Sequence, residues 1–205
     1  MIVVVDFGAG NLRNVCKALE HVGVQPVLTS DRHDLEHADK IVLPGVGAFA
    51  DCLNGLQTRN LFEPLRQVAL GGRPLLGICV GMQLLFEYGE EMGHWPGLGL
   101  LAGKVVRFQF NDGSARLKVP HIGWNQVEPR REHPLLRGVP AGSYAYFVHS
   151  YHPVASEPGD VIATTDYGYS FASIVARENI WGIQFHPEKS QDVGLQMLRN
   201  FVEAD

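Results

Sequence analysis

Cysteine is scarce in this sequence, and a basic charge excess and long apolar runs are absent. Three cysteines among 205 residues form neither a disulfide framework nor a C-x-x-C metal pair, so a reducing cytoplasm suits the chain. No apolar run reaches the ~18 residues that a membrane span needs, and the start lacks the basic region of a targeting peptide. Lys and Arg number 17 against 22 Asp and Glu, a net charge of −5, which argues against nucleic-acid binding.

Repeats and low-complexity tracts are also missing, and the length fits one large domain over residues 1–205. The first half alternates short apolar runs with longer amphipathic ones. In chain order it predicts a strand at 2–7, a helix at 11–23, a strand at 26–30, a strand within 38–49 that enters a glycine loop, a helix at about 50–70, a strand at 74–78 and a helix at 80–88. Such alternation predicts an α/β fold, an open and mostly parallel sheet with helices on both faces.

The second half is dominated by strand-like runs. They cover residues 104–110, 143–154, 161–167, 170–179 and 180–188. We expect them to extend the sheet with partly antiparallel strands. The last segment, about 191–203, has the apolar stripe of a closing helix that packs on the sheet.

The stretch Gly77-Ile78-Cys79-Val80-Gly81 has the form G-x-nucleophile-x-G, the signature of a sharp turn from a strand into a helix. Such a turn presents the thiol at the carboxyl edge of a parallel sheet, where ligands bind. The N–H of Val80 would then point to a forming oxyanion. A tight turn around a merely buried cysteine is the alternative, because this motif alone is of moderate specificity.

A base for this nucleophile is offered by the segment His186-Pro187-Glu188, which follows a strand-like run. In an extended chain, positions i and i+2 project to the same face. Glu188 could then accept a hydrogen bond from one ring nitrogen of His186 while the other nitrogen addresses the thiol. A polar turn after a strand is the plain alternative.

Together these motifs resemble the class I (triad) glutamine amidotransferases, whose fold is flavodoxin-like. The pattern G-x-C-x-G-x-Q is matched by Gly77, Cys79, Gly81 and Gln83, and the pattern H-P-E by residues 186–188. The resemblance spans nearly the whole chain. It implies hydrolysis of glutamine to glutamate and ammonia through a thioester on Cys79, with His186 as base and then acid and Glu188 orienting it.

Five further stretches resemble the glutaminase subunits of imidazole glycerol phosphate synthase, from histidine biosynthesis. They read DFGAGNLRNV, LPGVGAF, GMQLLFE, PHIGWNQV and YFVHSYH. The resemblance implies a heterodimer with a (β/α)8-barrel cyclase subunit, which uses the ammonia to convert PRFAR to imidazole glycerol phosphate and AICAR. Val80 departs slightly from the family, where leucine is more usual.

A second oxyanion donor is predicted in the loop Pro44–Gly47, which follows the third strand and should lie beside the cysteine turn. Its backbone N–H, that of Val46, is the candidate. Glycines on both sides allow the peptide to rotate. We hypothesise that it points away from the pocket in the free subunit and turns inward when partner and acceptor bind; an ordinary Pro-Gly turn is the alternative.

The resemblance also assigns substrate-binding residues. Gln83, Ser150 and Tyr151 would bind the α-groups or backbone of glutamine, Gly47 would add backbone contacts, and Glu91 or Glu90 could take the ammonium group. These two acids could equally be solvated residues at a helix end.

Four residues are assigned to the cyclase face, namely Asn11, Trp124, Tyr146 and Lys189. Trp124 stands between polar neighbours and beside a glycine, and tryptophan is a frequent interface anchor. A core tryptophan is the alternative. Lys189 directly follows Glu188, so it could report docking to the triad.

Other functions remain open at this stage. The loop at Gly8 and Gly10 is a partial dinucleotide signal with Arg13 in the third glycine slot, and Asp31 barely improves it. His121 and His149 show no metal-ligand spacing with His186, so we expect neither metal nor organic cofactor. A cysteine peptidase or glyoxalase-like hydrolase, a non-catalytic subunit, or a glutaminase serving pyridoxal phosphate, anthranilate or GMP synthesis are the competing interpretations.

Overall fold

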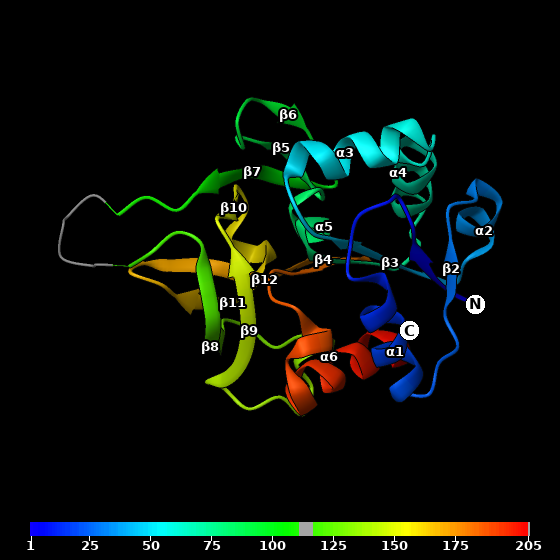
Figure 1. Cartoon of the computed structure of the whole chain (residues 1–205). Helices are drawn as coiled ribbons and strands as arrows, with labels where there is room; N and C mark the ends of the chain where they lie inside the picture. The colour runs from blue at the N-terminus through cyan, green and yellow to red at the C-terminus, as the bar shows by residue number, and fades with distance from the viewer. Residues whose placement is uncertain (111–116, 205) are drawn as a thin grey trace.

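A nine-stranded mixed sheet runs through the molecule (Figure 1). The computed structural model describes residues 1–110 and 117–204. The parallel strands, in spatial order, are β2 (Val27–Thr29), β1 (Ile2–Val5), β3 (Lys40–Gly45), β4 (Leu75–Cys79) and β13 (Ile180–Ile183). The sheet continues, antiparallel, with β12 (Ser170–Arg177), β11 (Val161–Asp166), β8 (His121–Pro129) and β9 (Ser143–His149). The predicted α/β fold is confirmed.

Helices cover both faces of the parallel strands, which explains why β1 and β4 are buried at every position. On one face, α1 (Leu12–His21) packs against α6 (Gln191–Glu203), so the predicted closing helix is confirmed. On the other face lie α3 (Phe49–Thr58) and α4 (Phe62–Leu70), as Figure 1 shows. The short helix α2 (Arg32–His37) packs against α4.

A second sheet of four strands lies beside the first, and the sequence did not indicate it. Its order is β10 (Tyr151–Ala155), β7 (Leu101–Arg107), β5 (Phe86–Gly89) and β6 (Trp95–Pro96). The predicted continuous run at 143–154 is therefore divided at Ser150 between β9 of the large sheet and β10 of the small one. The prediction that 104–110 and all of 143–154 extend one sheet was wrong.

Two predicted helices were also wrong in extent. The run at 50–70 is interrupted by Asn60, which has φ of +56° and ends α3, and Pro64 then lies in the first turn of α4, where a missing N–H costs little. The run at 80–88 forms only one helical turn, α5 (Val80–Gln83), before β5 begins. Because Met82 and Leu84–Phe86 are all fully buried, their apolar run has no periodicity that distinguishes helix from strand.

Helix α2 and the strands β6 and β8 were missed. Helix α2 begins at Asp31, whose carboxylate accepts a hydrogen bond from the N–H of His33 at 2.8 Å. Strand β8 pairs with β9 over residues 121–127, with Trp124 opposite Tyr146. Short 3-10 turns lie at η1 (Pro134–Leu136), η2 (Pro158–Asp160) and η3 (Pro187–Lys189). No helix in the described part of the chain is long and apolar enough to cross a membrane.

Candidate active site

Cys79 stands at the sharp turn between β4 and α5, as the glycine pattern predicts. Its backbone has φ of +56°, which a non-glycine residue adopts only under strain. The flanking glycines allow close backbone contact. A Cβ on Gly81 would lie 1.8 Å from the carbonyl oxygen of Leu43 on β3, and one on Gly77 would lie 2.6 Å from the carbonyl oxygen of Gly81. The two glycines are therefore required by the geometry of the turn.

The loop after β3 lies beside this turn, because Gly45 is the register partner of Cys79. The carbonyl oxygen of Val46 accepts a hydrogen bond from the buried thiol of Cys52, at 3.4 Å. Gly47 has φ of +95°, and nothing lies within 4 Å of the position its Cβ would take. Burial, and then the nearby Cys79, raise the pKa of the Cys52 thiol to about 12, so this group remains a protonated donor.

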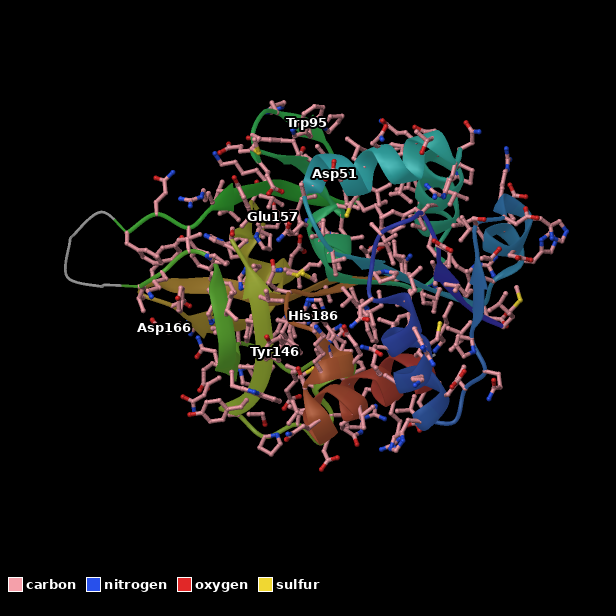
Figure 2. The ribbon with its side chains drawn as sticks, viewed as in Figure 1. Asp51, Trp95, Tyr146, Glu157, Asp166 and His186 are labelled. Carbon is pink, nitrogen blue, oxygen red and sulfur yellow. The ribbon has the colours of Figure 1, made fainter. Side chains whose placement is uncertain are left out.

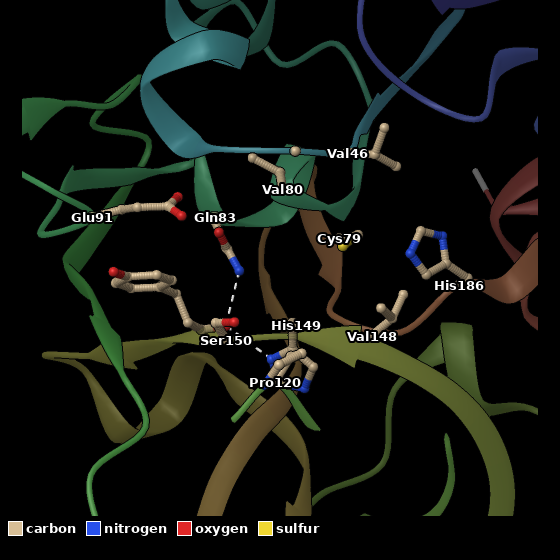
Figure 3. A pocket seen from close by; sticks show the side chains of 12 residues that line it. Val46, Cys79, Val80, Gln83, Glu91, Pro120, Val148, His149, Ser150 and His186 are labelled. Atoms are coloured by element: carbon tan, nitrogen blue, oxygen red, sulfur yellow. Dashed lines mark hydrogen bonds between the residues drawn. The ribbon is translucent and has the colours of Figure 1, made fainter. Parts of the chain in front are cut away.

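His186 reaches the site from the end of β13, and Glu188 orients it. Nδ1 of His186 lies 2.8 Å from Oε1 of Glu188, and both side chains are almost fully buried. The sequence correctly predicts that His186 and Glu188 are neighbours, but the backbone conformation differs from the predicted one. Glu188 lies in the 3-10 turn η3 and not in an extended strand. Figure 3 shows Cys79 and His186 facing each other across the pocket.

The charge state of His186 follows from these neighbours. Burial lowers the pKa of the imidazole, but hydrogen bonding to Cys79 and Glu188 and the negative charge of both groups more than offset this and raise it to about 10. At neutral pH the ring is therefore protonated, paired with a carboxylate on one side and a sulfur on the other. An imidazolium of this kind can give its proton to a leaving group.

The backbone of His186 is fixed to strand β9 by Ser190. The hydroxyl of Ser190 donates to the carbonyl oxygen of His186 at 2.6 Å and accepts from the N–H of Tyr146 at 3.0 Å. The N–H of His186 donates to the carbonyl oxygen of Tyr146 at 3.0 Å. Figure 2 shows His186 and Tyr146 close together near the centre of the molecule. This ring of bonds holds the imidazole in place from the β9 side.

Glu188 has a second neighbour on the N-terminal side. Nδ2 of Asn11, the residue before α1, donates to Oε1 of Glu188 at 3.4 Å. Oε2 of Glu188 is buried without a hydrogen-bond partner among the described residues. Asn11 thus links the Glu188 carboxylate to the loop between β1 and α1.

The pocket in front of Cys79 has a volume of about 280 Å³ (Figure 3). With the exception of Glu90, the alternative to Glu91, its lining includes the residues predicted for nucleophile, base, oxyanion hole and substrate: Cys79, His186, Val46, Val80, Gly47, Gln83, Glu91, Ser150 and Tyr151. Pro120, Val148 and His149 complete it. Glu188 stands behind His186 and outside this lining. A cavity of this size suits a small polar molecule rather than a polymer.

Two of the predicted substrate residues have internal partners. Nε2 of Gln83 donates to the carbonyl oxygen of Tyr151 at 3.0 Å, which leaves its Oε1 for the pocket. Oε2 of Glu91 accepts from the N–H of Phe49, the first residue of α3, at 2.7 Å. Glu90, the other candidate, is paired with Lys104 at 2.9 Å and does not line the pocket.

Of the residues predicted for a partner, Trp124 and Tyr146 lie on the strand pair β8–β9, Lys189 lies in the turn η3, and Asn11 precedes α1. Trp124 is 46% exposed and meets the ring of Tyr146 edge-on, with centroids 5.9 Å apart. The ammonium group of Lys189 lies 5.7 Å from the centre of the Tyr146 ring. Ile122 and Tyr144, on the same two strands, are 60% and 55% exposed. An apolar and aromatic surface of this kind beside a pocket is typical of a binding face.

Comparison with known proteins agrees with this geometry. The family model described as glutamine amidotransferase class-I matches residues 3–204. The chain belongs to the class I glutamine amidotransferases.

Two curated relatives of this amidotransferase carry the name imidazole glycerol phosphate synthase subunit HisH. The one from Salinibacter ruber is 50% identical over 98% of this chain and 94% of its own length. The one from Syntrophotalea carbinolica is 49% identical over 98% of both chains. A crystal structure titled glutamine amidotransferase shares the fold, with a TM-score of 0.75 at 21% identity over 99% of this chain and 98% of that one. The structure of PurLQS from Thermotoga maritima also shares the fold, with a TM-score of 0.74 at 19% identity over 98% of this chain and 96% of that one.

Several residues around the amidotransferase site were not predicted. Gln184 is fully buried, two residues before His186, and its Nε2 lies 3.9 Å from the sulfur of Cys79. Cys52 and Ser190 hold the backbones of Val46 and His186. Gln184 could have been noticed in the sequence, because it is a polar residue within the apolar run IWGIQF at 180–185. No local pattern indicates the other two, because their partners are backbone groups of distant strands.

The residues behind the nucleotide and metal interpretations have other partners in the structure. Asp31 caps α2, and the guanidinium of Arg59 lies where a Cβ on Gly8 would be, 2.6 Å from that position. His121 and His149 are hydrogen-bonded to each other at 3.1 Å. Within residues 1–110 and 117–204, no group of three or more His, Cys, Asp or Glu side chains is arranged to hold a metal ion.

Proposed function

We propose that this chain is the glutaminase subunit of an imidazole glycerol phosphate synthase. It hydrolyses glutamine to glutamate and ammonia and passes the ammonia to a separate cyclase subunit. The observation that carries the proposal is the placement of Cys79 opposite the His186–Glu188 pair in one small pocket. Identity of 50% with a HisH subunit over nearly the whole length supports the choice within the family.

In the proposed reaction, the Cys79 thiolate attacks the side-chain amide carbon of glutamine. The N–H groups of Val80 and Val46 would hold the developing oxyanion, and each such donor accelerates the step by about 10²–10³-fold. His186 gives its proton to the leaving nitrogen, so ammonia departs and a γ-glutamyl thioester remains. Water then attacks the thioester, with neutral His186 taking its proton, and glutamate leaves as the thiolate returns. Glu188 keeps the imidazole oriented in both steps.

Substrate binding is proposed for the far wall of the pocket. Gln83, Ser150 and Tyr151 would bind the backbone of glutamine, with Gly47 adding a backbone contact. Glu91 would face its ammonium group. The division of β9 and β10 at Ser150 supports this, since it turns both Ser150 and Tyr151 into the pocket lining.

The proposed partner is a (β/α)8-barrel cyclase, bound as a heterodimer through Asn11, Trp124, Tyr146 and Lys189. It would use the ammonia to convert PRFAR to imidazole glycerol phosphate and AICAR. Ammonia released into water becomes protonated and loses its nucleophilicity, so the two sites must communicate without exposure to solvent. The name of the relatives as subunits of a synthase supports a partner, and the exposed aromatic face beside the pocket supports its position.

We further propose that residues 1–205 act as one domain, in the cytoplasm, without nucleic acid or membrane as a partner. The proposed steps use side chains and water alone, so no cofactor enters them. The family match over residues 3–204 supports a single unit. A reducing compartment keeps the Cys79 thiol free for catalysis.

The test is a glutaminase assay of the full chain with and without the cyclase barrel and its ligand. We expect glutamate production to rise strongly when both are added and to vanish in Cys79→Ser. A chain that binds the cyclase yet produces no glutamate, or a Cys79→Ser variant with the wild-type rate, would contradict the proposal.

A further inference from the structure

The carbonyl oxygen of Tyr151 fixes the orientation of the polar groups around it, because a carbonyl oxygen can only accept. It receives Nε2 of Gln83 at 3.0 Å and Nδ1 of His149 at 2.8 Å. The amide of Gln83 must therefore present its nitrogen to Tyr151, and the reversed amide would place two oxygens against each other.

The same logic then determines the orientation of Gln184. Nε2 of Gln83 also donates to Oε1 of Gln184 at 3.2 Å. A reversed Gln184 would place two NH2 groups against each other, so its oxygen must face Gln83. Its nitrogen consequently faces the other way, toward Sγ of Cys79 at 3.9 Å. The carbonyl oxygen of Tyr151 thus fixes the orientation of the Gln83 amide, which in turn fixes that of the Gln184 amide beside Cys79.

The surroundings of Gln184 make this contact significant. Its side chain is fully buried, and Cys79 is the only acceptor that Nε2 has within residues 1–110 and 117–204. A buried donor without a good acceptor is costly. A neutral thiol is a weak acceptor, whereas a thiolate is a strong one, so the amide is best satisfied when Cys79 is ionised.

We propose that Gln184 is a catalytic residue whose amide N–H donates to the Cys79 sulfur and stabilises its thiolate. The proton that Cys79 loses goes to His186, and Gln184 neither takes nor gives one. The bond to the negative sulfur is lost as the sulfur becomes the neutral thioester and returns when glutamate leaves. Gln83 acts here as a positioning residue. The inference rests on the proposed function in that Cys79 is the nucleophile.

The experiment measures thiolate directly, by the rate at which iodoacetamide labels Cys79 at pH values from 5 to 10. Peptide mapping separates Cys79 from Cys52, which is buried, and from the partly exposed Cys16, whose thiol serves as the internal reference. Gln184→Met keeps the length of the side chain and removes the donor, and Gln184→Asn keeps an amide that falls short of the sulfur. The control is Asn200→Leu, which removes a buried amide donor that bonds two carbonyl oxygens, of Leu135 and Arg137, away from the pocket.

In both Gln184 variants we expect labelling of Cys79 near pH 6.5 to slow about tenfold and the midpoint of the pH profile to move upward, since hydrogen bonds to charged groups are worth at least this factor. The glutaminase kcat should fall by a similar factor, with KM for glutamine within about twofold. Asn200→Leu should lower the melting temperature and leave the labelling profile unchanged. Superimposable profiles for wild type and both Gln184 variants would overturn the inference.

A second measurement uses the wild-type chain and does not depend on the folding of a variant. The side-chain amide protons of Gln184 are followed by NMR before and after Cys79 is alkylated. We expect these signals to move while those of Asn200 stay in place, and unmoved Gln184 signals would count against the contact. Both measurements are independent of glutamine turnover. A chain with the expected labelling pattern and no glutaminase activity would refute the proposed function and leave the role of Gln184 intact.

Discussion

At the residue scale, the site concentrates strain and buried charge. Cys79 adopts φ of +56°, a conformation that costs on the order of 1–3 kcal/mol and persists because the backbone of β3 approaches within contact of Gly81. His186 and Glu188 form a charged pair that is almost entirely removed from water. Removing one member of such a pair leaves the charge of the other buried without a partner, which is costly.

The first prediction concerns Glu188→Gln. The amide would place a donor or a neutral oxygen against Nδ1 of His186, so the imidazole would lose both its orientation and the charge that keeps it protonated. We expect kcat for glutamine to fall on the order of 10²-fold, with a smaller change in KM. Steady-state kinetics measures this, with the exposed Glu63→Gln as control. Equal kcat values for the two variants would exclude an orienting role for Glu188.

At the element scale, the sequence predicted the parallel half of the fold and the meeting of Cys79, His186 and Glu188 at one site, because strand–helix alternation and the two short motifs are local patterns. It did not predict the second sheet. Strands β5 and β7 pair in parallel although β6 lies between them in the sequence, and β9 and β10 are contiguous in sequence yet belong to different sheets. Such strand pairings are decided by tertiary packing. The fully buried run after Cys79 has no hydrophobic periodicity that would have indicated a strand.

The second prediction concerns the loop after β3. Gly47→Ala places a side chain at φ of +95° in open space, so it stiffens the loop without a clash. Gly23→Ala is a matched control, since Gly23 has the same φ and equally open surroundings at the end of α1. Both variants should lose about 1 kcal/mol of stability.

Only Gly47→Ala should change the ratio of cyclase-stimulated to basal glutaminase activity, if the Val46 peptide must rotate. Glutamate release with and without the cyclase measures this ratio. Normal basal and stimulated rates in Gly47→Ala would refute the hypothesis of a rotating oxyanion peptide.

The third prediction concerns the paired histidines of β8 and β9. Burial lowers the pKa of His121 to about 4, and burial, followed by the neighbouring histidines, lowers that of His149 to about 3. The unfolded chain binds more protons than the folded one below about pH 6.5, so the free energy of unfolding decreases as the pH falls from there toward 4. At pH 5, each of the two histidines lowers the free energy of unfolding by about 2 kcal/mol.

Urea unfolding at pH 7 and pH 5 measures this effect. His121→Gln should reduce the difference between the two pH values, whereas His33→Gln, exposed on α2, should leave it unchanged. An undiminished pH dependence in His121→Gln would show that this histidine is not held neutral by the fold.

At the scale of the whole molecule, the pocket and the exposed aromatic surface share the strand β9, since Val148 and His149 line the pocket and Tyr144 and Tyr146 belong to the surface. His186 is bonded through Ser190 to the backbone of Tyr146, and the ring of that residue packs between Trp124 and Lys189. A partner seated on this surface would therefore contact the strand that holds His186, the proposed base. The arrangement gives a short physical route from docking to catalysis.

The fourth prediction is that Trp124→Ala weakens binding of the cyclase by at least about 30-fold, as for other tryptophan anchors. The melting temperature should change little, because the ring is 46% exposed. Titration calorimetry measures the affinity. Leu70→Ala, at an exposed position at the end of α4, is the control and should bind as the wild type does. Equal affinities for both variants would place the partner elsewhere.

The central claim, that Cys79 is acylated by glutamine, is tested most directly by mass spectrometry of the chain after rapid acid quench in the presence of glutamine, the cyclase and its ligand. We predict a glutamyl group on the peptide that contains Cys79, and neither adduct nor ammonia release in Cys79→Ala. Ammonia release at the wild-type rate by Cys79→Ala would contradict the account.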